Sequence, residues 1–264
     1  MAEIKIGTSG YSYADWVGPV YPEGTKSNKF LPLYSEIFDT VELNFSYYKM
    51  PKAENLAKML VDSGKNLTFA IKAYQSMTHD IDYSRWQDDA KTYMYAIDPL
   101  AGSGRLDAVL FQFPYSFYYD DDNRIYLDKL LNYFKDVPVA VEFRKTDWYC
   151  EKVVEGFTKR QVALAALDMP DLPKLPQTLD LVTAPLAYVR LHGRNKAAWW
   201  GNNANERYNY LYTDSELTMV ADKVKVLSEK AKRLLVYLNN HYTGKAVKNG
   251  QTLTGILKKM GIID

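Results

Sequence analysis

The chain has 264 residues, of which 47% are hydrophobic and 25% are charged, as in an ordinary globular protein. A formal net charge of +1 argues against a strongly basic nucleic-acid-binding protein, although it leaves room for a local basic patch. The one cysteine, Cys150, excludes an internal disulfide framework and is typical of a reducing compartment.

The first residues lack the apolar core of a signal peptide. No apolar run reaches the roughly 20 residues that a membrane-spanning helix needs. We therefore expect a soluble, cytoplasmic protein with no membrane partner.

Short apolar runs alternate with helical stretches along the chain. In chain order, strands are predicted at Ile4–Gly7, Thr40–Leu43, Leu67–Ala73, Ala108–Phe113, Val139–Arg144, Val162–Leu167, Ala187–Leu191 and Leu234–Asn239. The helical stretches between them include Glu54–Asp62, Arg124–Phe134, Glu151–Lys159 and Glu216–Lys232. This rhythm predicts an α/β fold, a single (β/α)₈ TIM barrel of parallel strands over residues 1–264. A doubly wound open sheet is the competing fold.

Polar residues recur on one face of the predicted strands, near their carboxyl ends. Side chains two apart on a strand share a face, and the face that meets the helices is too dry for unpartnered polar groups. We therefore predict that seven strands point polar side chains into the barrel mouth, where barrel enzymes build their sites: Glu42, Asn44, Lys72, Gln112, Glu142, Arg144, Asp168, Arg190, His192 and Asn239. The alternative is a buried ion-pair network that closes the barrel.

Acid/base chemistry is the first function that these residues favour. Three carboxylates and three cations are predicted around the same mouth. A carboxylate beside another carboxylate would have a raised pKa, whereas one beside an arginine would stay ionised, so acid and base roles could separate. Glu142 and Arg144, two apart on one strand face, are expected to form an ion pair, whereas Glu42 has no such neighbour in its strand and is the preferred general base. The candidate catalytic residues are Glu42, Glu142, Asp168 and His192.

Metal chemistry is a second alternative. The three histidines, His79, His192 and His241, follow predicted strands and could join the carboxylates in a zinc or manganese site. No close His-x-x-His or cysteine-rich spacing supports such a site. We therefore assign no metal ligand, although a divalent metal cofactor is still one of the alternatives.

Phosphate binding is a third alternative, because barrels often hold phosphate in the loops after strands seven and eight. In these loops Gly193 and Gly244 expose backbone N–H groups, and Arg194 and Lys245 add charge. Aromatic loops could stack on a base or a sugar ring, although they could equally cover the barrel rim. The predicted ligand-binding residues are Ser9, Tyr11, Asn44, Tyr48, Lys72, Gln112, Arg144, Arg190, Arg194, Asn239 and Asn240.

Several motifs resemble those of the YecE-like family, also called domain-of-unknown-function family 72. They span nearly the whole chain in the family's order: Gly7–Tyr13 with Trp16, Val41–Asn44 with Tyr47–Pro51, Thr78-His79, Phe111–Pro114, Val141–Arg144 with Trp148, Arg190–Arg194, and Asn239–His241. The resemblance implies a TIM barrel similar in outline to the endonuclease IV and xylose isomerase group, and it implies little about the reaction. The chain departs from the family's pattern at 44–48 and at 146–147, which puts ligand preference in doubt.

Together these observations lead us to expect an enzyme that acts on a polar, phosphate- or sugar-containing ligand, or on a nucleic-acid phosphodiester. The reaction would be an acid/base or metal-assisted hydrolysis. The rival hypothesis is a non-catalytic protein that binds a nucleotide or nucleic acid in the same mouth.

Overall fold

A computed structural model describes residues 2–201 and 203–264, and its strands form one parallel sheet. The strands are β1 (Glu3–Ser9), β2 (Thr40–Leu43), β3 (Thr68–Lys72), β4 (Leu106–Phe113), β5 (Val139–Phe143), β6 (Ala163–Leu164), β7 (Ala166–Asp168), β8 (Leu186–Leu191) and β9 (Arg233–Leu238). Their order in the sheet is β6-β5-β4-β3-β2-β1-β9-β8-β7. All eight predicted strands are therefore present, with shifts at their ends.

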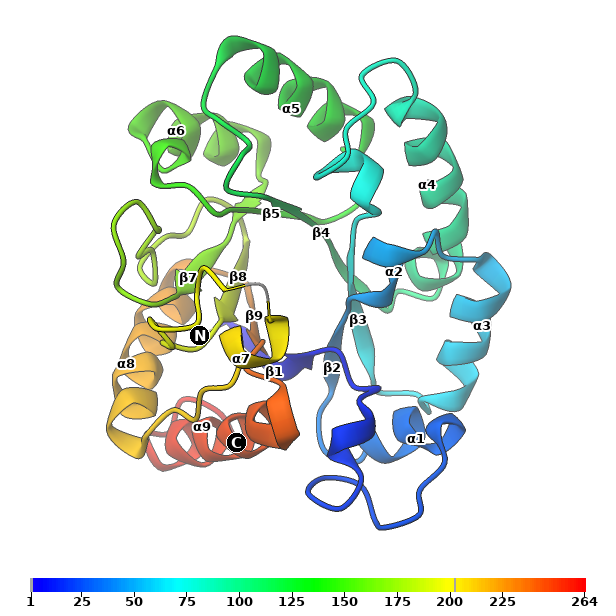
Figure 1. The fold of residues 1–264 in the computed structure, drawn as a ribbon, viewed down its shortest axis with the longest axis vertical. Coiled ribbons are helices and arrows are strands. Elements are labelled where there is room, and N and C mark those ends of the chain that lie inside the picture. Colours follow the sequence, from blue (N-terminus) through cyan, green and yellow to red (C-terminus); the bar gives the residue numbers. More distant parts are fainter. Residues whose placement is uncertain (1, 202) are drawn as a thin grey trace.

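The sixth predicted strand joins the two edges of this sheet. It is split at Ala165 into β6, which pairs with β5, and β7, which pairs with β8. The Ala165 N–H still donates to the Val141 carbonyl at 2.8 Å. The sheet thus curls into a nearly closed parallel barrel, as the sequence predicted, and a ring of helices surrounds it (Figure 1).

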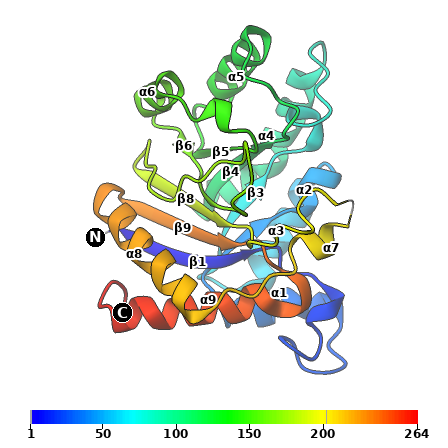
Figure 2. The ribbon, with the colours of Figure 1, turned by 60° about the vertical axis from the view of Figure 1, so that its left-hand side comes forward.

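The helices are α1 (Phe30–Tyr34), α2 (Phe45–Tyr48), α3 (Ala53–Asp62), α4 (Trp86–Gly102), α5 (Asp121–Tyr133), α6 (Glu151–Arg160), α7 (Ala204–Arg207), α8 (Asp214–Lys230) and α9 (Lys245–Lys259). The four expected helical stretches correspond to α3, α5, α6 and α8. Figure 2 shows α8 and α9 packed along β1 and β9. None of the described helices is both long enough and apolar enough to span a lipid bilayer.

Two long helices were not among the expected ones. Helix α4 contains Pro99, and α9 contains Gly250 and Gly255, residues that weaken a helical pattern in sequence. Conversely, residues 169–185 between β7 and β8 contain no helix. The strand–helix alternation is therefore interrupted once.

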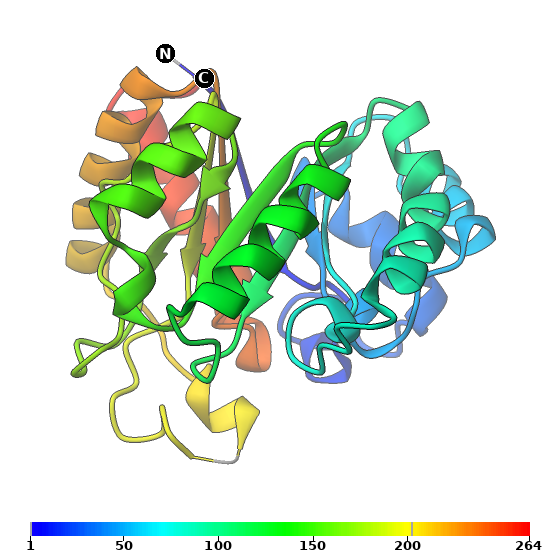
Figure 3. The ribbon, with the colours of Figure 1, turned by 90° about the horizontal axis from the view of Figure 1, so that it is seen from above.

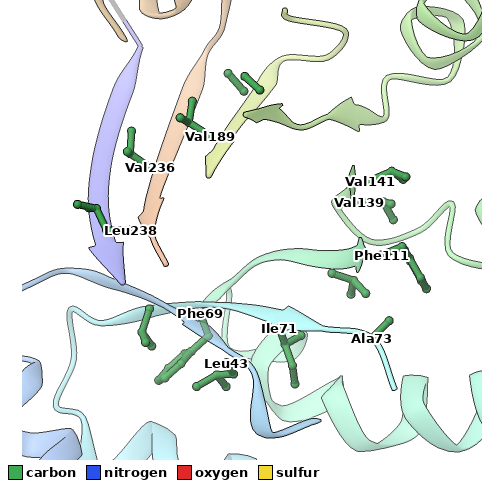
Figure 4. Packing of buried hydrophobic residues seen from close by; sticks show 14 of the residues in the cluster. Leu43, Phe69, Ile71, Ala73, Phe111, Val139, Val141, Val189, Val236 and Leu238 are labelled. Carbon is green, nitrogen blue, oxygen red and sulfur yellow. The ribbon is translucent and has the colours of Figure 1, made fainter. Parts of the chain in front are cut away.

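The main hydrophobic core lies between the barrel wall and the helices. Alternate residues of each strand point into it, and Figure 4 shows Leu43, Phe69 and Ile71 together on β2 and β3. A second, smaller cluster fills the barrel interior and includes Ala70 and Leu110. This sorting confirms the predicted faces of β2, β3, β4, β5, β8 and β9.

A buried carboxylate closes the end of the barrel where the strands begin. The Asp107 carboxylate accepts hydrogen bonds from Thr40 at 2.8 Å and Thr68 at 2.5 Å, and Arg233 lies 3.4 Å from it. Both chain termini lie at this end, whereas α7 and its flanking loops lie at the other (Figure 3). The polar strand ends therefore face an open mouth on the side of α7.

Gly7 permits the close approach of β1 and β2. A Cβ atom at this position would lie 2.1 Å from the Thr40 carbonyl oxygen. We expect Gly7→Ala to lower the free energy of unfolding by about 1–3 kcal/mol or more through overpacking. Gly255→Ala in α9, where nothing lies within 4 Å, should instead raise it by about 0.5–1 kcal/mol. Urea unfolding of both variants tests this contrast, and a neutral Gly7→Ala would contradict it.

Candidate functional site

One arginine links two carboxylates across the barrel mouth. Arg190 at the end of β8 donates from Nε at 2.9 Å and from Nη2 at 2.7 Å to the two oxygens of Glu42 on β2. Its Nη1 donates to Glu142 Oε2 on β5 at 2.5 Å. Both carboxylates are fully buried and Arg190 is 2% exposed. The ion-pair network that the sequence left as an alternative is therefore present.

Further side chains hold the two carboxylates in place. Tyr188 donates to Glu42 Oε2 at 2.7 Å, and Arg144 Nε lies 2.7 Å from Glu142 Oε1. The expected pairing of Glu142 with Arg144 is thus found, whereas Glu42 is occupied by a partner 148 residues away in sequence. A carboxylate bound on both oxygens is poorly placed to act as a general base.

His192 completes the network as a neutral ring. Its Nε2 lies 3.2 Å from Glu142 Oε2, and its Nδ1 lies 3.0 Å from Asn239 Nδ2. Because an amide nitrogen can only donate, Nδ1 accepts and Nε2 carries the proton toward Glu142. Burial, reinforced by Arg144, lowers the pKa of His192 to about 3. Burial opposes ionisation of Glu142 too, yet Arg144, Arg190 and His192 outweigh it and hold its pKa well below the ordinary value.

A cavity of about 640 Å³ lies above this network, within the range of small-molecule sites. It lies at the carboxyl ends of the strands, as predicted. Its walls combine polar strand ends with aromatic loop residues: Gly10, Tyr11, Ser12, Tyr13, Leu43, Asn44, Phe45, Tyr47, Tyr48, Lys72, Gln112, Arg144, Arg190, Asn205, Tyr208, Asn239 and His241.

Lys72 enters the cavity from the end of β3. Its Nζ donates to Gln112 Oε1 at 2.8 Å and lies 4.1 Å from the centre of the Tyr47 ring. No carboxylate of the described residues forms an ion pair with it. Burial, with the nearby charges of Arg190 and Arg144, lowers the pKa of Lys72 to about 7.

Aromatic rings form much of the rest of the wall. Tyr13 stacks on His241 with ring centres 4.5 Å apart, and Tyr208 lies 5.6 Å from the same imidazole. Although burial acts to raise the pKa of Tyr208, the surrounding guanidinium groups, led by Arg144, lower it. Tyr48 stands at the rim with 74% of its surface exposed.

Asp168 is not part of this site. It shares a strand face with Leu164 and Ala166, which pack against the helices, whereas Ala165 and Leu167 point into the barrel. Its carboxylate accepts from Arg194 Nη2 at 2.6 Å and from Tyr212 at 2.8 Å. The prediction that Asp168 faces the interior is wrong. The residues before it on the strand are apolar on both faces, so the sequence does not show which face points inward.

Three of the predicted ligand-binding residues also lie outside the cavity wall. Arg194 is bound to Asp168 and to Glu216, so the loop after β8 does not present its charge to the mouth. Asn240 is buried and donates to Tyr210 and Asn249. Ser9 is buried, and its hydroxyl has no hydrogen-bond partner within the described residues.

The remaining predicted ligand-binding residues all line the cavity, namely Tyr11, Asn44, Tyr48, Lys72, Gln112, Arg144, Arg190 and Asn239. The ligand-binding prediction did not include Tyr208 and Asn205. They come from the segment around α7, where no periodicity or motif marks them. Lys245, expected to add charge for phosphate, bonds Asn209 instead.

The histidines and carboxylates do not combine into a metal site. Within residues 2–201 and 203–264, no group of three or more His, Cys, Asp or Glu side chains is placed to hold a metal ion. His79 packs edge-on against Tyr47, while His192 and His241 contact Glu142 and Tyr13. No metal-dependent step is therefore assigned to the residues described.

A second hollow lies on the outer wall between α5 and α6. It encloses about 680 Å³ beside Ile125, Val153 and Phe157. It lies on the helical shell, away from the polar strand ends. We therefore take the mouth cavity as the functional site.

Fold and site together define a TIM-barrel-like protein with a cation-bearing cavity at the carboxyl ends of its strands. The family model described as "Protein of unknown function DUF72" matches residues 5–262. The chain belongs to the DUF72 family.

Individual relatives agree with this assignment. A DUF72 family protein of Thermotoga maritima with a known crystal structure is 35% identical, with a TM-score of 0.88 over 97% of this chain and 99% of that one. A DUF72 family protein of Enterococcus faecalis is 27% identical, with a TM-score of 0.86 over 97% and 95% of the two chains. The UPF0759 protein YunF of Bacillus subtilis is 31% identical over 269 residues, or 96% of this chain and 94% of YunF.

Removing Arg190 should leave the buried Glu42 carboxylate without a cationic partner and leave Glu142 with Arg144 alone. We expect Arg190→Met to lower the free energy of unfolding by about 3–5 kcal/mol. The triple variant Glu42→Gln, Glu142→Gln, Arg190→Met removes all three charges and should recover much of this loss. Urea unfolding at pH 7 measures both, and an equally unstable triple variant would show that the loss comes from packing.

His192 should make the protein less stable in acid. Its pKa is about 3 when folded and about 6.5 when unfolded, so between these values only the unfolded chain binds the proton. The free energy of unfolding should therefore fall with decreasing pH by about 1.4 kcal/mol per pH unit from this residue. We expect His192→Gln to flatten the pH dependence between pH 6 and 4 by that amount. An unchanged slope in urea unfolding would contradict the neutral state of His192.

Proposed function

We propose that the protein is an enzyme that binds a small anionic ligand in the mouth cavity and acts on it by acid/base chemistry. The observation that carries this proposal is an excess of positive charge. Glu42 and Glu142 are both engaged by Arg190, while the cations Lys72 and Arg144 also face the cavity. With Asp168 elsewhere, the two carboxylates are matched by Arg190 and Arg144, and Lys72, whose pKa is about 7, adds positive charge in its protonated form. A phosphate or carboxylate of the ligand would supply the missing charge.

Arg144 is the residue best suited to bind this anion. Its Nε is next to Glu142, and its terminal nitrogens donate to no other residue of the described chain. A guanidinium group with free terminal donors suits a phosphate or carboxylate, which it can bind with two parallel hydrogen bonds. Glu142 would then act by orienting Arg144 rather than by contacting substrate.

The aromatic lining favours a ligand with a ring. Tyrosine and histidine rings offer flat apolar faces that stack on sugars and bases. Tyr13, stacked on His241, and the exposed Tyr48 supply such faces at the rim. A phosphosugar or a nucleotide combines the ring with the anionic group that the cations require.

The proposed acid/base groups are Lys72 and Tyr208. Both line the cavity, and both have a pKa moved toward neutrality, which is what proton transfer at neutral pH requires. Hydrolysis of a phosphate- or sugar-containing ligand is the reaction class that we propose, with Arg190 and Arg144 offsetting negative charge that develops during the reaction. Glu42 and His192 would serve as positioning residues for Arg190 and Glu142.

The alternative, a non-catalytic protein that binds a nucleotide or nucleic acid, draws on the same aromatic rim. It differs in its dependence on salt. Contacts with several phosphates would weaken binding steeply with rising salt, whereas one anionic group in a small cavity would give a shallow slope. Titration of a single-stranded oligonucleotide at two salt concentrations separates the two proposals.

Arginine substitutions test the anion site. We expect Arg144→Gln to weaken binding of inorganic phosphate by about 10–100-fold, the equivalent of losing a hydrogen bond to a charged group worth about 1.5–3 kcal/mol. Arg194→Gln is the matched control, since Arg194 is bound to Asp168 outside the cavity; it should lower stability and leave phosphate affinity within about twofold. Isothermal titration calorimetry measures both. Equal phosphate affinity in wild type and Arg144→Gln would refute the proposed site.

A further inference from the structure

We propose that Lys72 is a nucleophile that forms an imine with the carbonyl carbon of an anionic substrate held in the mouth cavity. This inference rests on the anion site of the proposed function, and it replaces hydrolysis with covalent chemistry at a carbonyl group, in which Lys72 is the nucleophile. The substrate would be an aldehyde or ketone that also carries a phosphate or a carboxylate.

The surroundings of Lys72 are those of a reactive amine rather than of a structural ion pair. Its nitrogen has one hydrogen-bonding neighbour, Gln112 Oε1, and otherwise lies over the Tyr47 ring. A lysine retained for stability would be expected beside a carboxylate, yet both nearby carboxylates are bound by Arg190. Lysine becomes nucleophilic when it is desolvated or placed beside another cation, and Lys72 is partly buried and close to the charges of Arg190 and Arg144.

The protonation state of Lys72 suits attack at neutral pH. With a pKa of about 7, roughly half of the Lys72 amine is unprotonated at pH 7. For an ordinary lysine with a pKa near 10.4, the unprotonated fraction is on the order of one in a few thousand. The lone pair needed for attack is therefore available without a separate base.

The same cavity offers the other groups that the step requires. Arg144 would bind the anionic group of the substrate and hold its carbonyl near Lys72. Tyr208 lines the cavity with a lowered pKa and can supply a proton to the carbonyl oxygen. Lys72, Arg144 and Tyr208 all line the cavity, and the step needs no redox partner.

The step balances without an oxidant or a reductant. The amine lone pair of Lys72 forms a C–N bond as the carbonyl π pair moves to oxygen, which takes a proton from Tyr208. The attacking nitrogen then returns a proton to the Tyr208 phenolate, and Tyr208 passes that proton to the hydroxyl oxygen as the C–O bond breaks and water leaves. The protonated imine that results loses its remaining N–H proton to the Tyr208 phenolate, which restores Tyr208. The net change is amine plus carbonyl to imine plus water.

Pyridoxal phosphate is a suitable probe, because it joins an aldehyde, a phosphate and an aromatic ring. The protein is incubated with it at pH 7, reduced with borohydride and mapped by peptide mass spectrometry. We expect Lys72 to be labelled at least about tenfold faster than the exposed Lys58, because far more of its amine is unprotonated. The labelling rate should reach half of its maximum near pH 7, and inorganic phosphate should compete.

Two variants serve as controls. Lys72→Arg keeps the positive charge but removes the nucleophile, so the label at this position should disappear. Lys245→Arg replaces a lysine that bonds Asn209 and does not line the cavity, so labelling of Lys72 should be unchanged. Label spread over surface lysines with Lys72 unmodified, or a rate that keeps rising to pH 10, would overturn the proposal.

Phosphate calorimetry on the same samples separates this inference from the proposed function. If phosphate binds through Arg144 but Lys72 does not react, the imine is refuted and the anion site stands. If Lys72 reacts selectively but phosphate neither binds nor competes, the nucleophile stands and the anion site is refuted. Pyruvate and dihydroxyacetone phosphate, trapped in the same way, then distinguish a carboxylate from a phosphate substrate.

Discussion

The paired charges of Arg190, Glu42 and Glu142 are the constraint on which the barrel mouth depends. Three strands, β2, β5 and β8, each contribute one of these side chains, and a charge in this dry interior is costly without its partners. The network therefore ties together strands that are not neighbours in the sheet. It also forms the rigid floor of the cavity above it.

This arrangement changes what the carboxylates can do. In an open active site, Glu42 and Glu142 would be natural acid and base groups, but here their oxygens are already bound by arginine, tyrosine and histidine. Their negative charge is neutralised by Arg190 and Arg144. The charged groups that line the cavity are cationic, among neutral amide, imidazole and phenolic groups, so we expect the site to favour anions and place the proposed reactivity on Lys72 and Tyr208.

Alternation along the strands predicted most of this correctly, and it failed where alternation carried no information. Along β5 and the residue that follows it, Glu142 and Arg144 alternate with Val141 and Phe143, so the sequence indicated which face points inward. In the sixth strand both faces are apolar, and Asp168 was assigned inward from its charge alone. Its true partner, Arg194, lies in the loop after β8, and no local spacing connects the two.

The sequence by itself determined the parallel barrel, the polar mouth and the pairing of Glu142 with Arg144, because each depends on periodicity and near neighbours in one chain segment. Only the tertiary structure showed that Arg190 pairs with Glu42, that Asp168 lies outside the site, and that Tyr208 lines the cavity. These outcomes depend on distances between strands and loops far apart in the chain. Burial and the nearby positive charge of arginine side chains then lower the pKa values of Lys72 and His192, which no linear pattern encodes.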